Sequence, residues 1–363
     1  MSIEFIGYIG NRNGSETIPY SGPVIDREHI RAAASIHENG GFDRVLLAFH
    51  SHSPESLLVG QYAASVTERL GFLLAHRPGF VAPTLAARQL ATLDHLTGGR
   101  VAVHIITGAA DAEMARDGDW LTKDERYART SEYIDILRLQ WQADEPFDYD
   151  GAYYRVAGAR SDVKPRNLPI FFGGSSAAAV AVAGRHADTY ALWGETLEQV
   201  AETIAAIRAA AAPHGRHPRF SLSLRPILAD TEQAAWDKAE RLLARATELR
   251  EAEGPTRHIA TGGSSNPPNE GSRRLLAAAD KGARLDKRLW TGMAKLTGAA
   301  GNSTSLVGTA DQVAEAMLDY HRIGIDTFLI RGFDPLEDAF LYGRDLIPRV
   351  RALVGESASI AAE

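Results

Sequence analysis

The chain has 363 residues, of which 45% are hydrophobic and 23% are charged, and its formal net charge is −7. This is the composition of a globular protein, and its acidic balance argues against a general nucleic-acid or membrane binder, since both need basic surface. The absence of cysteine excludes disulfides, thiolate nucleophiles and thiolate metal sites, and it fits a reducing compartment.

Targeting signals are not evident in the sequence. The first residues, 1–7, lack both a basic region and a long apolar region, so we expect a mature strand there rather than a signal peptide. No apolar run reaches the roughly 18 residues that a membrane-spanning helix needs. We therefore expect a cytoplasmic protein.

Short apolar runs alternate with helical stretches along the whole chain. In the first half we predict strands at 4–10, 44–49, 71–76 and 101–107, and helices near 26–39, 54–67, 84–96 and 124–142. In the second half we predict strands at 169–173, 188–193, 220–228 and 327–330, and helices after Ser176 and near 196–212, 233–250 and 336–353. Apolar strands that alternate with helices indicate a buried parallel sheet, and eight such units predict an α/β fold of the TIM (β/α)₈ barrel type.

Two stretches interrupt this alternation within what we expect to be a single domain over residues 1–363. Residues 143–167 predict a small hairpin with a turn at Asp150–Gly151. Residues 251–308 are rich in Gly, Ser, Asn and Pro and then become basic. A long insertion in a compact domain favours a mobile lid over the barrel mouth, and a passive surface insertion is the alternative.

Active sites of such barrels lie at the carboxyl ends of the strands, so the residues after each strand are the candidates. The clearest local signal is Gly173-Gly174-Ser175-Ser176, which follows the fifth predicted strand. Two glycines let backbone approach a ligand, and two serines stand beside the free N–H groups of a helix start, which favours a phosphate site. An ordinary turn with a serine N-cap is the alternative.

Three arginines, Arg77, Arg225 and Arg331, lie in or beside apolar strands, where a guanidinium needs a carboxylate partner or an anionic ligand. Trp193 ends the sixth strand and either stacks on a ligand or fills the core. His50 and His52 follow the second strand. Together with His76 they allow a metal site, which their poor carboxylate partners disfavour.

Several motifs resemble those of the bacterial luciferase-like flavin monooxygenases, and most closely the two-component alkanesulfonate monooxygenases. The similarity covers nearly the whole chain. The matching segments are 86–100 (AARQLATLDHLTGGR), 124–127 (DERY), 169–176 (PIFFGGSS), 192–195 (LWGE) and 324–328 (GIDTF).

The resemblance implies a reduced-FMN-dependent monooxygenase that uses O₂ through a C4a-peroxyflavin. An NAD(P)H-dependent flavin reductase would be its partner, and a homodimer or homotetramer its assembly. The implied reaction is cleavage of the C–S bond of an organosulfonate to give an aldehyde and sulfite. The cofactor-binding residues implied are Ser175, Ser176, Gly174, Thr107, Tyr127, His76 and Arg77. The candidate catalytic residues are Arg225, Trp193, Arg331 and His50.

The substrate side departs from the family pattern. Ser223 and Arg225 stand where the alkanesulfonate enzymes carry an Arg-x-His pair, and Pro54 stands in place of a cysteine. Thr297 replaces a lid arginine and Phe333 a tyrosine. Another organosulfur compound, or a different small oxygenated molecule, is therefore an open alternative for the substrate.

Three other functions stay open at this point. A deazaflavin (F420)-dependent dehydrogenase on the same barrel would transfer hydride without oxygen. A flavin-binding relative without turnover would bind FMN alone. A metal-dependent hydrolase is the least favoured.

Overall fold

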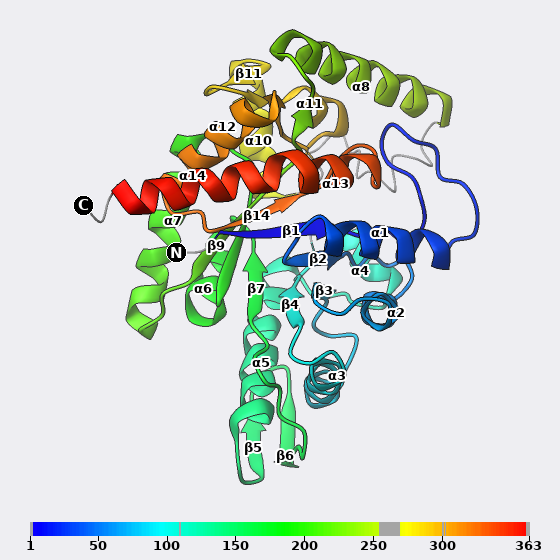
Figure 1. Ribbon diagram of the computed structural model, residues 1–363. Coiled ribbons are helices and arrows are strands. Elements are labelled where there is room, and N and C mark those ends of the chain that lie inside the picture. The colour runs from blue at the N-terminus through cyan, green and yellow to red at the C-terminus, as the bar shows by residue number, and fades with distance from the viewer. Residues whose placement is uncertain (1–2, 109, 254–268, 300, 302, 361–363) are drawn as a thin grey trace. The chain divides into compact units, whose positions relative to one another are not determined.

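The computed structural model describes residues 3–108, 110–253, 269–299, 301 and 303–360 (Figure 1). Eight strands form a closed barrel in the order β1-β14-β9-β8-β7-β4-β3-β2, and helices surround it. The pairs β1–β14, β14–β9, β3–β4 and β4–β7 run parallel. The predicted (β/α)₈ barrel is thus confirmed.

The barrel strands lie close to their predicted positions. They are β1 (Glu4–Tyr8), β2 (Arg44–Leu47), β3 (Gly71–His76), β4 (Val101–Ile105), β7 (Ile170–Gly173), β8 (Thr189–Trp193), β9 (Arg219–Leu224) and β14 (Thr327–Ile330). Their residues are largely buried, as expected for strands covered on both faces.

Several helices begin at a residue whose side chain accepts a hydrogen bond from the free N–H groups of the first turn. Asp26 caps α1 (Arg27–Asn39), and Thr122 and Glu125 form a capping box at α5 (Lys123–Gln142). The others that match the prediction are α2 (Ser56–Ser65), α3 (Pro83–Leu96), α6 (Ala177–His186), α7 (Leu197–Ala211), α8 (Glu232–Glu253), α13 (Glu337–Leu341) and α14 (Ile347–Ile360). The last two are joined by a π-helical turn, η2 (Tyr342–Leu346), and a 3₁₀ turn, η1 (Ala212–His214), follows α7.

Outside the stretch 251–308, two helices of the described chain were not predicted. The first is α4 (Asp111–Arg116), whose six residues are too few to show a periodic pattern. The second is α12 (Ala310–Arg322), which Thr309 and Gln312 begin with a capping box. That box is a sequence signature, and it could have located α12.

The predicted strand 220–228 was wrong in extent. Pro226 has no backbone N–H and cannot continue the ladder, so β9 ends at Leu224. The chain resumes as β10 (Ile227–Leu228) in a second, four-stranded sheet of order β10-β13-β12-β11.

The stretch 251–308 contains regular structure in its described part. It holds α10 (Glu270–Lys281), β11 (Arg284–Leu285), β12 (Leu289–Trp290), α11 (Gly292–Thr297) and β13 (Ser305–Gly308). Residues 254–268, 300 and 302 of the predicted lid lie outside the described residues. That the stretch acts as a lid stays a prediction.

The chain divides into two compact units. Unit 1 comprises Met1–Val45, Ala191–Ala205 and Arg219–Glu363, and unit 2 comprises Leu46–Tyr190 and Ala206–Pro218. Unit 1 contains the four-stranded sheet, which packs with α8 around a cluster that includes Trp236, Trp290 and Phe333. The expected single domain stays a prediction.

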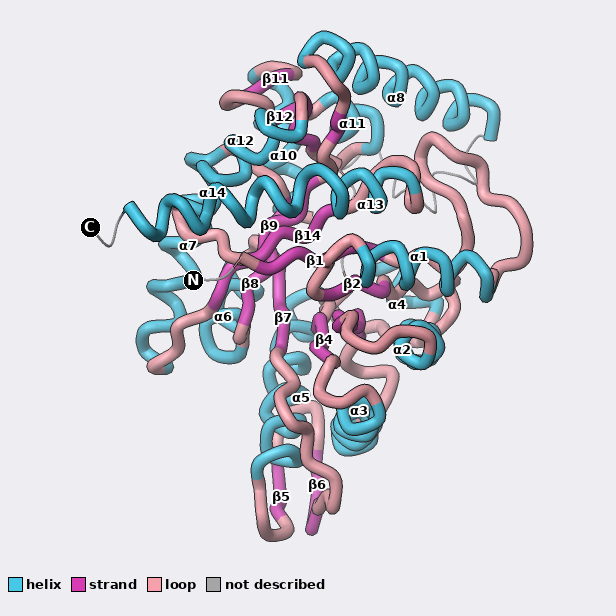
Figure 2. Tube along the Cα trace, in the orientation of Figure 1, coloured by secondary structure: helices cyan, strands magenta, loops and turns pink. Residues whose placement is uncertain are grey.

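Unit 2 contains the predicted hairpin, β5 (Phe147–Asp150) paired antiparallel with β6 (Arg155–Ala159). Its turn spans residues 151–154, closed by a hydrogen bond from the Gly151 amide to the Tyr154 carbonyl. The Glu132 carboxylate on α5 accepts from the amides of Ala152, Tyr153 and Tyr154, which places the hairpin beside α5 (Figure 2).

No helix among the described residues is long and apolar enough to cross a membrane.

Candidate active site

The predicted phosphate turn in unit 2 leads directly from β7 into α6. The Ser176 hydroxyl accepts a hydrogen bond from the Ala179 amide at 3.3 Å, as an N-cap does. Ser175, beside it, is exposed. The first turn of α6 presents free N–H groups with the positive end of the helix dipole, which together favour an anion.

Gly174 makes this turn possible. Its φ of +135° lies in a region that side chains disfavour. A Cβ on Gly174 would lie 2.8 Å from the Ala179 Cβ and 2.9 Å from the Tyr127 hydroxyl oxygen. Tyr127 in turn hydrogen-bonds with Ser176, and burial raises its pKa, so its phenol stays protonated and can donate. Three predicted cofactor residues therefore meet at one turn.

Thr107 follows β4, the strand next to β7 in the barrel. Its hydroxyl oxygen is buried and finds no hydrogen-bond partner within the described part of the chain. An unsatisfied buried hydroxyl costs about 1–3 kcal/mol, so such groups are uncommon unless a ligand or water completes them. The orphaned hydroxyl and the glycine cradle fit a phosphate-bearing cofactor such as FMN.

The third strand end is occupied by protein partners. His76 Nε2 lies 2.7 Å from the Tyr133 hydroxyl, and burial lowers the His76 pKa to about 4. Arg77 is only 4% exposed and donates to Glu113 at 3.0 Å and to Ser51 at 3.3 Å. Arg77 therefore pairs with a carboxylate, which was one of the two partners expected for it. That His76 or Arg77 contacts the flavin stays a prediction.

Glu113 also contacts residues that follow the second strand, His50 and Ser51. Burial alone would raise its pKa, but His50 and Arg77 outweigh burial and lower it to about 2. His50 Nδ1 lies 3.7 Å from Glu113, and its side chain is 52% exposed. Sequence reasoning missed Glu113 because the short helix that carries it, α4, showed no period.

In unit 1 the structure brings Arg225 and Arg331 together on one carboxylate, Glu16. Arg225 donates to it at 2.9 Å and Arg331 at 2.7 Å. Burial alone would raise the Glu16 pKa, but the two guanidiniums hold it well below its ordinary value. Both arginines thus pair with a carboxylate, as Arg77 does. Together Arg225, Arg331 and Glu16 retain one net positive charge.

The Arg225 guanidinium is 1% exposed and lies 3.7 Å above the ring of Phe333, the residue that departs from the family's tyrosine. Its Nη2 also donates to the Gly332 carbonyl at 2.9 Å, whereas its Nη1 has no partner among the described residues. Glu16 was missed, although it lies in the loop after β1, where a strand-end search could have found it.

Trp193 ends β8 and is half-buried against α10. A Cβ on Gly271, in the first turn of α10, would lie 3.0 Å from the indole Cζ3, so helix backbone lies against the ring. Two residues on, Glu195 forms a bidentate pair with Arg274 of α10 at 2.7–3.0 Å. One side of the tryptophan is therefore covered by the stretch that we predicted to be a lid.

Thr297, the other departure in that stretch, bonds its hydroxyl to the Met293 carbonyl at 2.9 Å within α11. The Thr297 hydroxyl therefore makes a hydrogen bond within α11 itself.

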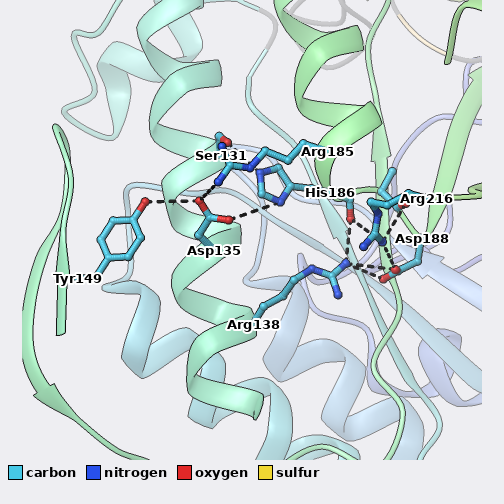
Figure 3. Close-up of polar contacts among 9 residues, drawn as sticks. Ser131, Asp135, Arg138, Tyr149, Arg185, His186, Asp188 and Arg216 are labelled. Carbon is cyan, nitrogen blue, oxygen red and sulfur yellow. Dashed lines mark hydrogen bonds and ion pairs between the residues drawn. The ribbon is translucent and has the colours of Figure 1, made fainter. Parts of the chain in front are cut away.

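Figure 3 shows a Ser–His–Asp arrangement in unit 2 that sequence reasoning did not single out. Ser131 Oγ lies 2.8 Å from His186 Nε2, but His186 Nδ1 lies 3.9 Å from Asp135, beyond hydrogen-bonding distance. Burial and the neighbouring Arg185 lower the His186 pKa to about 3, which makes a poor general base at neutral pH. These contacts join α5 to the end of α6 and do not form a nucleophilic triad.

No cluster of three or more His, Cys, Asp or Glu side chains suited to a metal ion occurs among the described residues.

Comparison with known proteins identifies the family. A model described as luciferase-like monooxygenase matches residues 3–327. The chain therefore belongs to the luciferase-like monooxygenase family, a family of oxidoreductases whose members use flavin or F420.

Solved structures share the fold at low identity. A riboflavin lyase, determined with modified FMN and riboflavin, has a TM-score of 0.80 and 20% identity over 97% of this chain and 92% of that one. EDTA monooxygenase from Chelativorans sp. BNC1 has a TM-score of 0.74 and 18% identity over 97% and 94%. An F420-dependent secondary alcohol dehydrogenase, in complex with an F420–acetone adduct, has a TM-score of 0.68 and 18% identity over 96% and 99%.

Proposed function

We propose that this protein is a monooxygenase that binds reduced FMN from a separate NAD(P)H-dependent flavin reductase and oxidises a small organosulfur compound with O₂. The α6 turn carries the proposal, because Gly174, Ser176 and Tyr127 meet there at a helix N-terminus. A cytoplasmic location and a homodimer or homotetramer remain parts of it.

In this proposal each residue at the turn has its own contact with the cofactor. The free N–H groups of α6 and the Ser176 hydroxyl bind the phosphate, and the Tyr127 phenol donates a further hydrogen bond. Thr107 orients the cofactor through its otherwise unpaired hydroxyl. When bound, reduced FMN supplies the electrons that activate O₂. The barrel interior excludes water from the reacting groups.

An alkanesulfonate-like organosulfonate is the proposed substrate, cleaved at its C–S bond to an aldehyde and sulfite. The support is the surplus positive charge of Arg225 and Arg331 over Glu16, since guanidinium groups suit sulfonate oxygens. The unpartnered Arg225 Nη1 is the donor that this proposal assigns to the sulfonate.

The binding test is anaerobic titration of reduced FMN. Ser176→Ala should weaken binding by about 10- to 150-fold, because a hydrogen bond to a charged group contributes about 1.5–3 kcal/mol. Ser65→Ala is the matched control, since Ser65 is an exposed helical serine that bonds only to the Tyr62 carbonyl. Equal affinities for the Ser176 variant and the control would remove the phosphate assignment.

The activity test couples the protein to a generic flavin reductase with a panel of sulfonates and sulfones. Oxygen consumption together with sulfite or sulfinate release is the expected result. Sulfone turnover without sulfonate turnover would keep the monooxygenase and reject the sulfonate.

An F420-dependent dehydrogenase is the second candidate, supported by the fold shared with the F420-dependent alcohol dehydrogenase. F420 also carries a phosphate and a tricyclic ring, so the same turn could serve it. Reduction of F420 by an alcohol, with no oxygen consumption in the presence of reduced FMN, would favour this candidate.

A further inference from the structure

His104 lies on β4 and points into the barrel. Its backbone is in register with Ala75 of β3 and Phe171 of β7, and side chains in register on neighbouring strands share a face. Leu74, next to Ala75, points the other way, because a Cβ on Gly60 of α2 would lie 2.6 Å from its Cδ2. Ala75, His104 and Phe171 therefore form one interior layer.

The imidazole Nδ1 has no hydrogen-bond partner in the described part of the chain. This atom is buried, whereas the residue as a whole keeps part of its surface accessible. Burial lowers the His104 pKa to about 4, so the ring is neutral at physiological pH. A neutral imidazole has one donor and one acceptor nitrogen, and the protein leaves the Nδ1 side of this ring for another partner.

The neighbourhood points to a ligand ring. Thr107, three residues on, carries the second unpaired polar atom of this strand end. On the adjacent strand, Gly174 of the phosphate turn comes three positions after Phe171, which is about 10 Å of extended chain. FMN carries its phosphate and its flavin ring at opposite ends of a sugar-alcohol chain. With the phosphate bound at the turn, this chain would bring the flavin ring toward the interior layer of Ala75, His104 and Phe171.

From this geometry we propose that His104 hydrogen-bonds the edge of the flavin ring and positions it. The inference rests on the proposed function, since it deepens the same cofactor site. The carbonyl oxygens and N–H of a flavin edge match the donor and acceptor of the imidazole. His104 thus acts on the cofactor ring, while Ser176 and Tyr127 act on its phosphate.

Two variants separate this role from a structural one. His104→Phe removes both nitrogens but keeps a planar ring, and His104→Gln keeps a donor and an acceptor. We expect His104→Phe to weaken reduced FMN binding about 10- to 100-fold, because a hydrogen bond in a buried site is lost while its flavin partner stays unsatisfied. The same variant should raise the melting temperature of the ligand-free protein, because an unsatisfied buried nitrogen is removed. His104→Gln should retain most of the affinity.

His29→Phe is the matched control. His29 on α1 is also buried with an unpaired Nε2, but it lies outside the barrel. It should leave the affinity for reduced FMN within about twofold of wild type, since a helix on the outside of the barrel does not touch the cofactor site.

Nitrogen-15 NMR of histidine-labelled wild type gives a readout that needs no turnover and no variant. The His104 ring resonances should shift when reduced FMN is added anaerobically. Unshifted His104 resonances, together with unchanged affinity in His104→Phe, would overturn the assignment and leave His104 as a water-bound core residue. If wild type binds no reduced FMN at all, the proposed function fails and this inference fails with it.

Discussion

Replacing Glu16 by glutamine tests whether the two arginines of unit 1 depend on this single carboxylate. Glu16 accepts from Arg225 at 2.9 Å and from Arg331 at 2.7 Å. The exposed fractions of the three side chains are 15% for Glu16, 1% for Arg225 and 29% for Arg331. Glu16→Gln keeps the shape of the side chain but leaves both guanidiniums without this counter-charge.

The expected loss of unfolding free energy is about 3 kcal/mol. Breaking a fully buried pair costs about 3–5 kcal/mol, and the partial exposure of Arg331 and the remaining amide oxygen place this case at the lower end. The control is Glu270→Gln, which breaks the exposed pair with Arg273, whose side chain is 58% exposed. The control should cost less than about 1 kcal/mol.

Equilibrium urea unfolding measures both variants. Glu16→Gln combined with Arg225→Met should lose less than the two single variants together, because the uncompensated buried charge is removed. A loss for Glu16→Gln no larger than that of the control would refute the role assigned to the buried trio.

Three further predictions concern pH, the phosphate turn and α10. Unfolding free energy should fall as the pH drops from about 6.5 toward 4, by about 1.4 kcal/mol per pH unit for each histidine that burial keeps neutral, because the unfolded chain takes up a proton that the folded chain does not. The four with folded pKa values of about 4, 4, 4 and 3 are His37, His76, His104 and His186. Urea midpoints compared between neutral and mildly acidic buffers check this, and midpoints that do not change would contradict it. Gly174→Ala should reduce affinity for reduced FMN at least tenfold through its clash with Tyr127, whereas Gly215→Ala, at a positive φ in open space, should leave affinity unchanged and cost only about 1–2 kcal/mol of stability. Glu195→Gln should release the Arg274 contact and speed proteolysis within α10. The control is Glu202→Gln, which removes only the longer, exposed contact to Arg274 at 3.9 Å and should leave the cleavage rate unchanged. Equal cleavage rates in the two variants would argue against anchoring of α10 by Glu195.

Local pattern was enough to predict the barrel. Strands such as β3 and β14 were predicted to the residue, since fully buried parallel strands read as continuous apolar runs. The turn from β7 into α6 was also visible, because its glycines and serines stand at a helix start, and its binding of a phosphate stays a prediction. Pro226 could also have predicted the end of β9, and the capping box at Thr309 could have predicted the start of α12. Both signals lie in the sequence and were not used.

Interactions between residues far apart in the chain required the tertiary structure. Arg225 and Glu16 are separated by 209 positions, so no local pattern could indicate whether the arginine meets a carboxylate or an anionic ligand. The same holds for Arg274, which reaches Glu195 across 79 positions. His104 looked like any residue in an apolar strand, and only the register with Ala75 and Phe171 showed that it points into the barrel. Period and capping are properties of neighbouring residues, whereas charge pairing and the facing of a strand depend on how the whole chain packs.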